Sequence, residues 1–399
     1  MATACDPAPL GGFAGRHAAT AAGATRDAAF AGAVARAVTR YAAALYERGG
    51  LPVATAAEAH FPTIDPGTLT LFSDAQYRQP GFPYVPFTPT TPVRWASAID
   101  LATGSVVHVP AALVWHPFVY LRRAGDLPVL PPGADGLAYG DGVAAASLAG
   151  LYDVVAADAA ALFWCSMTPP PRIALDTLPP ALRRLAARFG PDGGGLALLD
   201  VTTDNRIAAV VAMLSSDRPG APAFALAAAA DLDPARAVEA ALGRLAATRR
   251  RARTVLAERP SPSPANDWED VIDADDHLAF AAAREHAERL AFMQASDDLR
   301  PLADRDGGAT GSVEGDLEQA VTRVALTGAS VLSANLTSAD LAALGLAVCR
   351  VVVPGYQPLA VGHRLRALGG TRLFEVPQKL GHRGIPRGSA GNAAPHPFG

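Results

Sequence analysis

Three long stretches with helical periodicity, separated by short strand-like segments, constrain the fold of this chain most. Residues 27–48 follow the N-cap candidate Thr25, end before two glycines, and carry an apolar stripe made of Phe30, Val34, Val38, Tyr41 and Leu45. Residues 143–164 place a second apolar face on Leu148, Leu151, Tyr152, Val155 and Leu162. A third helix is expected to begin at Asp233-Pro234 and to end in a basic run at Arg253. We expect each apolar face to be buried.

Strand-like segments lie between these helices. β-branched and aromatic residues bounded by Pro and Gly predict strands at 93–95, 105–109 and 113–121, and apolar runs predict buried strands at 196–201 and 207–213. The Pro/Ser-rich stretch 257–265 predicts a linker between a core of residues 1–256 and a second part, 266–399. In the second part we expect a helix at 277–293, strands near 331 and at 346–353, and an irregular Pro-rich tail. The residues alone therefore indicate a protein that combines helices with strands.

Composition excludes several kinds of chemistry. The single lysine, Lys379, is followed by Leu380, so the chain has no Gly-Lys-Ser/Thr phosphate loop. A net charge of −4 favours no nucleic-acid partner. Cys5, Cys165 and Cys349 are too few and too far apart for a disulfide framework, which favours a cytoplasmic protein, and the Ala-, Arg- and Pro-rich composition is typical of high-GC bacterial genomes. The apolar stretches are broken by Asp or Gly and no secretory signal begins the chain, so no membrane span is expected.

Two local motifs have simpler structural explanations. Gly140-x-Gly142-x-x-Ala145 is similar to a dinucleotide loop, but no clean strand precedes it, and a glycine-permitted turn into a helix explains it better. The acidic run from Asp267 to Asp276 lacks the central Gly and spaced Glu of a calcium loop, which favours a solvated loop. The histidines form no HExxH pair and no GxSxG elbow is present, so these patterns identify no active site.

The order of several other segments is more informative. The first of these segments is a pair of strand-like stretches, Trp95 to Gly104 and Val107 to Val114. A helical segment that contains Asp153, Asp158 and Trp164 comes later in the chain. Further segments come in the same order: Gly136 to Gly140, Leu199 to Asp204, Asp276-His277, Asn335 to Gly345, Val353 to Gly355, Arg372 to Pro377, Leu380-Gly381 and Pro395 to Phe398. Taken together, this ordered set resembles the YcaO-domain family of ATP-dependent enzymes that modify peptide backbones.

This resemblance implies an α+β, YcaO-like fold with mixed or antiparallel sheets packed against helices. Family cyclodehydratases use ATP to activate a peptide amide oxygen after a Cys, Ser or Thr side chain attacks the preceding carbonyl, which yields a thiazoline or oxazoline. Other members install thioamides or amidines. The implied partners are a precursor peptide, a leader-peptide-binding protein and, as a further candidate, a second YcaO protein; a dimer is expected, and no nucleic acid or membrane. The tail residues Pro395, His396 and Pro397 are expected near the reaction centre.

The first two signature helices depart from the family pattern where it binds ATP and Mg²⁺. The first is expected to read Ser-Ala-x-x-Glu-x-x-Glu-Arg, but Arg36 and Thr39 occupy the two Glu positions and the Ser is also lost; Ala33 and Arg40 are kept. The second is expected to read Glu-x-x-Glu-Arg-Asp-Ala. There the chain keeps acids at Asp153 and Asp158 but has alanines at the intervening Glu and Arg.

The third helix departs as well. Arg244 and Thr248 stand where Glu-x-x-x-Gln is expected, and Glu239 is the acid nearby. Since Mg²⁺ requires oxygen ligands, a site changed in this way should repel it, whereas arginine forks still bind phosphate oxygens. A solvated helix face is the alternative explanation for Arg36 and Arg40.

The preferred hypothesis is therefore a YcaO-like protein with a degenerate ATP site, acting as a non-catalytic or partner-dependent subunit of an azoline-forming complex. No metal ligand is predicted. One alternative is an active cyclodehydratase with a divergent site that still uses ATP and Mg²⁺, and another is an anion- or nucleotide-sensing protein. The residues expected at the cofactor site are Arg36, Thr39, Arg40, Asp153, Asp158, Arg244 and Thr248, and the divergent-enzyme alternative would use Asp153, Asp158 and Arg40 together with Glu239.

Overall fold

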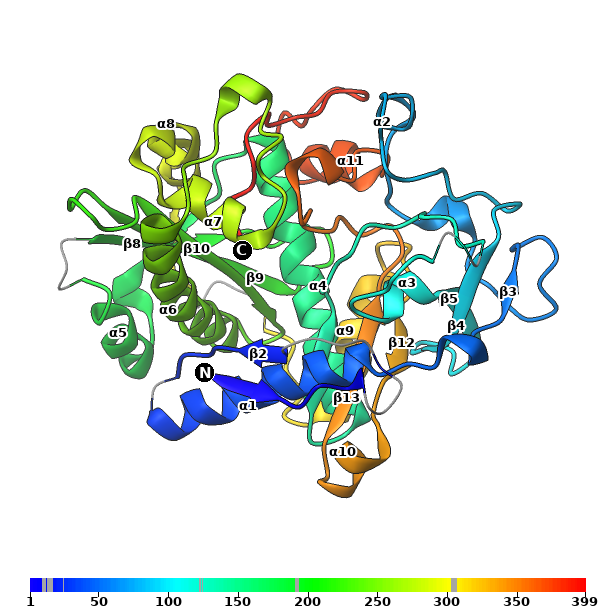
Figure 1. Cartoon of the computed structure of the whole chain (residues 1–399). Helices are drawn as coiled ribbons and strands as arrows, with labels where there is room; N and C mark the ends of the chain where they lie inside the picture. Colours follow the sequence, from blue (N-terminus) through cyan, green and yellow to red (C-terminus); the bar gives the residue numbers. More distant parts are fainter. Residues whose placement is uncertain are drawn as a thin grey trace.

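A central helix, α4 (Val143–Ser166), lies between two β-sheets in the computed structural model of the chain (Figure 1). The structure describes residues 1–8, 12, 17–23, 25–121, 123, 125–190, 194–302 and 307–399. On one side α4 packs against β9 and β10 of the first sheet, and on the other side against β6 and β13 of the second. The helix is therefore shared by both layers.

The first sheet has five strands in the order β10-β9-β8-β7-β11. Neighbouring strands are antiparallel except for the parallel pair β7 and β11. The segment 208–214 of β9 is buried on both faces, because α6 (Pro234–Glu258) covers one face and α4 the other. The strands are β7 (Arg172–Ile173), β8 (Gly194–Asp200), β9 (Ala208–Ser216), β10 (Phe224–Asp231) and β11 (Leu299–Arg300).

The second sheet has six strands, in the order β3-β4-β12-β13-β6 with β5 paired to β4, and all its pairs are antiparallel. Gly136, which precedes β6, has a φ of +82°, and a Cβ there would lie 2.2 Å from the Val351 carbonyl oxygen. Only glycine therefore permits this close approach of β6 to β13. The strands are β3 (Val53–Ala54), β4 (Val93–Asp100), β5 (Val106–Pro110), β6 (Leu137–Gly140), β12 (Leu332–Asn335) and β13 (Ala347–Val352).

The remaining elements surround these layers. Helix α1 (Arg26–Ala44) packs on β6 and on a small pair of strands, β1 (Ala2–Ala4) and β2 (His17–Ala19). Shorter helices are α2 (Asp74–Tyr77), α3 (Ala111–Val114), α5 (Pro180–Ala187), α7 (Ala274–Ala282), α8 (Ala287–Leu290), α9 (Val313–Ala325), α10 (Ala339–Ala343) and α11 (Arg372–Lys379). Single 3₁₀ turns lie at Arg48–Gly50, Pro66–Thr68, Leu175–Thr177, Pro264–Asn266, Arg284–His286, Ala291–Gln294 and His363–Leu365.

This architecture confirms the predicted α+β fold with mixed and antiparallel sheets packed against helices. Three local predictions were wrong. Residues 113–121 form the end of α3 and irregular chain instead of a strand, and the helix expected at 277–293 is interrupted at Ala283, whose backbone is extended. On α1, Phe30 is exposed and the buried positions belong largely to alanines. Strands from both sides of the proposed linker share sheets, since β11 pairs with β7 and β12 with β4, and α6 runs into residue 258.

Helix α4 also corrects the expectation that no segment could span a membrane. It is long and apolar enough to do so by length and composition. However, 89% of its apolar window is buried inside the fold, where the two sheets cover it. The apolar character of α4 is thus explained by its position at the centre of the core.

Candidate functional site

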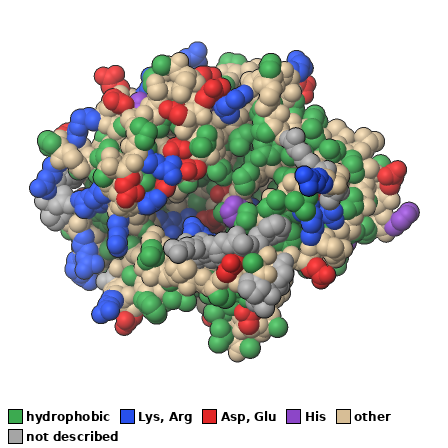
Figure 2. Space-filling view, viewed as in Figure 1, with side chains coloured by type: hydrophobic (Ala, Val, Ile, Leu, Met, Phe, Trp, Pro, Cys, Tyr) green, Lys and Arg blue, Asp and Glu red, His purple; other side chains and the backbone are tan. Residues whose placement is uncertain are grey.

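Helices α1, α4 and α6 bring three predicted residues together: Arg36, Asp153 and Arg244. The Nη1 atom of Arg244 lies 2.9 Å from Oδ1 of Asp153, and the charges of both residues reach Arg36. The backbone N–H of Gly136 donates to Asp153 Oδ2 at 3.1 Å. Figure 2 shows acidic, basic and histidine side chains in a hollow on this face of the molecule, above α1 and in front of α4. The structure therefore places residues from all three signature helices at one site.

Positive charge dominates this hollow. Loss of surrounding water and the neighbouring charge of Arg244 lower the pKa of Arg36. Burial, together with the charges of Arg350 and Arg40, lowers the pKa of His116 to about 4, so His116 is neutral at pH 7. His116 thus adds no charge, and Arg36, Arg40 and Arg244 outnumber the Asp153 carboxylate, so an anion is the ligand that such a surface attracts.

The two threonines at the predicted site, Thr39 and Thr248, contribute less to the polar surface of the hollow than the arginines do. Thr39 is buried, and its hydroxyl donates to the Ala35 carbonyl oxygen of its own helix at 2.8 Å. Thr248 is half-buried on α6, one turn after Arg244. The hydroxyl hydrogen of Thr39 is therefore already used within α1.

The residues of the hollow do not fit Mg²⁺. Arg244 occupies one oxygen of Asp153 and the Gly136 amide the other. The next carboxylate, Asp135, accepts from the Leu359 amide at 3.2 Å. Among the residues that the structure describes, no group of three His, Cys, Asp or Glu is placed to hold a metal ion. A divalent cation would thus meet a guanidinium where the chemistry of Mg²⁺ requires several oxygens.

A cavity of about 130 Å³ adjoins the hollow, and its polar residues were missed from the sequence. It is lined by Arg350, Asp135 and Gln357 among mostly apolar side chains. Burial and the nearby charge of Asp153 raise the pKa of Asp135 to about 6, and Arg350 opposes that shift. One signal was present: Arg350 is the single charged residue in the apolar run 346–353, which was predicted as a strand.

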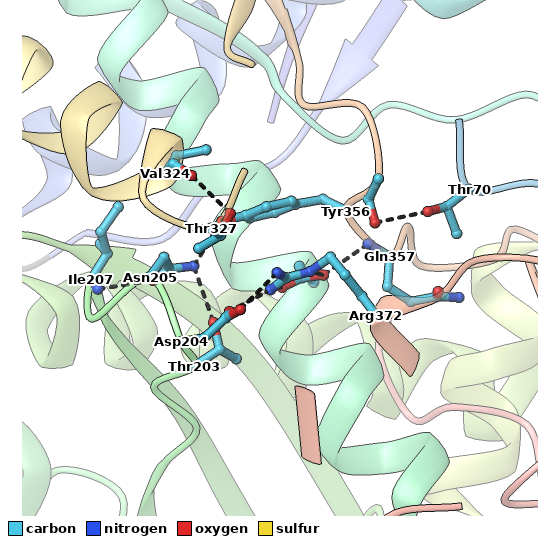
Figure 3. Close-up of polar contacts among 12 residues, drawn as sticks. Thr70, Thr203, Asp204, Asn205, Ile207, Val324, Thr327, Tyr356, Gln357 and Arg372 are labelled. Atoms are coloured by element: carbon cyan, nitrogen blue, oxygen red, sulfur yellow. Dashed lines mark hydrogen bonds and ion pairs between the residues drawn. The ribbon is translucent and has the colours of Figure 1, made fainter. Parts of the chain in front are cut away.

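Asp158 lies outside this site. Its side chain is fully buried, and it accepts hydrogen bonds from Arg372 Nε at 3.0 Å, Arg372 Nη2 at 2.6 Å and the Gln357 amide at 2.8 Å; Arg372 and Gln357 are labelled in Figure 3. Arg372 also bonds to Asp204, and its guanidinium stacks over the Tyr356 ring at 4.1 Å. Five positions along a helix turn a side chain by roughly 140°, which explains why Asp158 and Asp153 face different neighbours. Both oxygens of Asp158 are used internally, which gives it a role in packing.

The tail residues Pro395, His396 and Pro397 also lie away from the hollow. The His396 ring stacks on His277, with centroids 3.7 Å apart, and its Nε2–H donates to the Ala360 carbonyl oxygen at 2.7 Å. The Trp164 Nε1–H donates to the neighbouring Ala394 carbonyl at 3.3 Å. This anchor sits at the C-terminal end of α4, roughly 16 Å along the helix from Asp153. The sequence motif was noticed, but its burial shows that it secures the tail to the core.

Comparisons with known proteins give one family and one fold. A family model described as YcaO cyclodehydratase, ATP- and Mg²⁺-binding, matches residues 20–357. A search of curated proteins found no match. Among solved structures, a heterocyclase in complex with substrate and cofactor superposes with a TM-score of 0.77 at 21% identity, over 95% of this chain and 49% of that one. This chain therefore spans about half the length of that heterocyclase.

Two further structures share the fold. YcaO from Methanopyrus kandleri, bound with AMPPCP and Mg²⁺, has a TM-score of 0.59 at 24% identity, over 85% of this chain and 78% of that chain. The E. coli microcin synthetase McbBCD complex with pro-MccB17 bound has a TM-score of 0.58 at 13% identity, over 85% of this chain and 82% of that chain.

Proposed function

The chain belongs to the YcaO cyclodehydratase family, and from this premise we propose that it serves azoline formation on a ribosomally made peptide as a non-catalytic or partner-dependent subunit. One observation carries the proposal. Arg244 is 2.9 Å from Asp153, so the carboxylate that remains on α4 in the hollow is already paired with a cation of the chain itself.

The electrostatic argument concerns phosphoryl transfer. The charge that develops on the transferred phosphoryl group is stabilised mainly by metal ions and cationic side chains. The hollow supplies Arg36, Arg40 and Arg244 but lacks an oxygen cluster for a metal among its described residues. Such a surface favours anion binding over ATP hydrolysis, which supports a role in binding and assembly.

We assign the chemistry and leader-peptide recognition to partners in a cytoplasmic complex. The McbBCD structure contains several proteins together with a peptide, and the first heterocyclase was solved with a substrate. By analogy, a leader-peptide-binding protein and a second YcaO protein with complete Glu motifs are the partners we propose, along with dimer formation and a precursor peptide as the substrate of the complex.

The decisive experiment measures ATP turnover by the purified chain, with Mg²⁺, alone and with candidate partners and peptide. We expect no turnover by the chain alone and formation of azolines when a competent partner is added. Robust Mg²⁺-dependent turnover by the chain alone would overturn the proposal and support the divergent-enzyme alternative.

A charge-reversal pair sharpens this experiment. Arg36→Glu with Arg244→Glu should abolish turnover in a divergent enzyme that depends on these residues, and it should leave the basal rate of a non-catalytic chain at zero. The matched control is Arg184→Glu with Arg188→Glu, two exposed positions around α5. Calorimetry with ATP and with phosphate, with and without Mg²⁺, tests the anion-sensing alternative, because that alternative requires tight binding that is independent of the metal.

A further inference from the structure

Arg350 is a buried cation with unused hydrogen-bond donors. It lies on β13, its residue is 6% exposed, and its buried Nε and Nη1 donate to no described residue. Asp135 and Asp153 influence it only through their charges, since neither forms an ion pair with it. Asp135 lines the same cavity as Arg350 but is not paired with it, so the guanidinium keeps unused N–H donors that an anionic ligand would satisfy.

The cavity lined by Arg350 limits what that anion can be. Its volume is about 130 Å³, and apolar side chains including Leu69, Leu71, Leu113 and Leu130 form much of its wall. A cavity of roughly 150 Å³ with such a lining accommodates a benzene-sized group, whereas pockets for whole drug-sized ligands start at about 300 Å³. The space therefore suits one branched or aromatic side chain and is too small for a nucleotide.

Gln357 lines the same cavity and carries an unsatisfied hydrogen-bond acceptor. Its Nε2–H donates to the Ala367 carbonyl oxygen at 2.7 Å, which fixes the orientation of the amide group. Its backbone N–H is held by Asp158. Its Oε1 is buried and has no hydrogen-bond partner among the described residues. A ligand that satisfies both Arg350 and Gln357 must accept at one group and donate at another.

We propose that this cavity binds the carboxyl-terminal residue of a peptide whose last side chain is apolar. The carboxylate accepts from the Arg350 guanidinium, the amide N–H of the same residue donates to Gln357 Oε1, and the side chain occupies the apolar wall. Carboxylate–guanidinium bonds are among the stronger polar contacts in proteins, and a low-dielectric cavity strengthens them further. The inference stands apart from the proposed function, because it involves neither ATP nor a partner protein.

Calorimetry on the full chain, without nucleotide, tests the assignment with N-acetyl-leucine as the probe. We expect N-acetyl-leucinamide, which keeps the shape but lacks the charge, to bind roughly tenfold to hundredfold more weakly. Absence of binding by N-acetyl-leucine, or equal affinity of acid and amide, would overturn the proposal. Equal affinity for 4-methylpentanoate would assign the cavity to free apolar carboxylates, and tighter binding of inorganic phosphate would assign it to phosphate; either result would also overturn the peptide-terminus assignment.

Variants identify the residues that bind the probe. Arg350→Met should weaken N-acetyl-leucine binding roughly tenfold or more, since it keeps most of the volume and removes the charge, whereas Arg188→Met, at an exposed site, should leave it unchanged. If Arg350→Met fails to fold, Ala157→Leu provides a second route, because residue 157 lines the cavity and the larger side chain fills it. In that variant N-acetyl-leucine should no longer raise the melting temperature, as it should in the natural chain. An unchanged affinity in both variants would contradict the proposal.

Discussion

At the scale of single residues, Arg372 shows how this molecule treats buried charge. Its guanidinium serves two carboxylates, those of Asp158 and Asp204, and joins α11 to α4 and to the turn between β8 and β9. The two aspartates raise the pKa of Arg372 although burial opposes that effect. Because Asp158 is fully buried and Asp204 partly so, the Asp158 charge in particular is tolerable only while the arginine is present.

Replacing Arg372 with methionine should therefore be strongly destabilising. We expect the free energy of unfolding to fall by about 3–5 kcal/mol, because Asp158 would remain fully buried without its cation. Urea denaturation followed by circular dichroism measures the loss. Arg387→Met is the control, since Arg387 pairs with Glu375 on the exposed surface and should cost less than about 1 kcal/mol. Equal effects of the two substitutions would contradict this account of the network.

The stacked pair His277 and His396 predicts sensitivity to acid. Burial lowers the pKa of His277 to about 4, from 6.5 for an exposed histidine, and places that of His396 well below its ordinary range. Between pH 6.5 and about 4 the unfolded chain thus binds more protons than the folded chain, so stability should fall as the pH falls through this window.

His277→Phe tests this prediction by removing one titrating group while keeping a ring against His396. We expect a shallower loss of stability between pH 6.5 and 4 in denaturant titrations at several pH values. The control His60→Gln changes an exposed histidine and should leave the slope as it is. A natural chain whose unfolding midpoint stays constant across this window would refute the argument.

At the scale of whole elements, the central helix ends at a strained residue. Met167, the C-cap of α4, has a φ of +51°, and its side chain is exposed. Glycine adopts this left-handed conformation without the steric cost that a Cβ imposes. Met167→Gly should therefore raise the free energy of unfolding by about 0.5–1 kcal/mol. Ala240→Gly, at an exposed position inside α6, should lower it by a similar amount, so opposite signs in thermal melts are the expected result.

The helices were predictable from periodicity, but their faces were only partly so. The α1 prediction at 27–48 is close to Arg26–Ala44, yet its apolar stripe begins with exposed Phe30 because close packing against β1, β2 and β6 selects alanines. Strand β10 went unpredicted, since its alanine-rich sequence has no strand signature and its pairing with β9 is a tertiary feature. Local pattern decides where an element forms, and packing decides which face is buried.

The candidate site was predictable in part for a similar reason. Motif spacing placed Arg36, Asp153 and Arg244 on three helices, and the fold brings these together. It did not reveal that Asp158 turns towards Arg372, or that His396 is buried against His277. Those partners come from segments more than a hundred residues away, whose positions no local pattern records.

At the scale of the whole molecule, the C-terminal tail is part of the core. Phe398 is 6% exposed and belongs to the same buried cluster as α4, although the chain ends one residue later in the structure. Phe398→Ala should lower the free energy of unfolding by about 3–5 kcal/mol, because it leaves a cavity among packed side chains. Phe30→Ala, which truncates a ring that is 66% exposed, should change it by less than about 0.5 kcal/mol. Guanidinium unfolding of both variants measures the contrast, and a small effect of Phe398→Ala would show that the tail is dispensable.

The bond between Arg244 and Asp153 has a consequence for how the molecule depends on its surroundings. It joins α6, which covers the first sheet, to α4, which lies between both sheets. The bridging cation is tethered to the polypeptide, so it cannot be removed by a chelator or diluted away. The melting temperature should accordingly be the same in excess EDTA and in millimolar magnesium. The link between α6 and α4 thus needs no bound metal ion, although dissolved salt still screens the partly exposed pair.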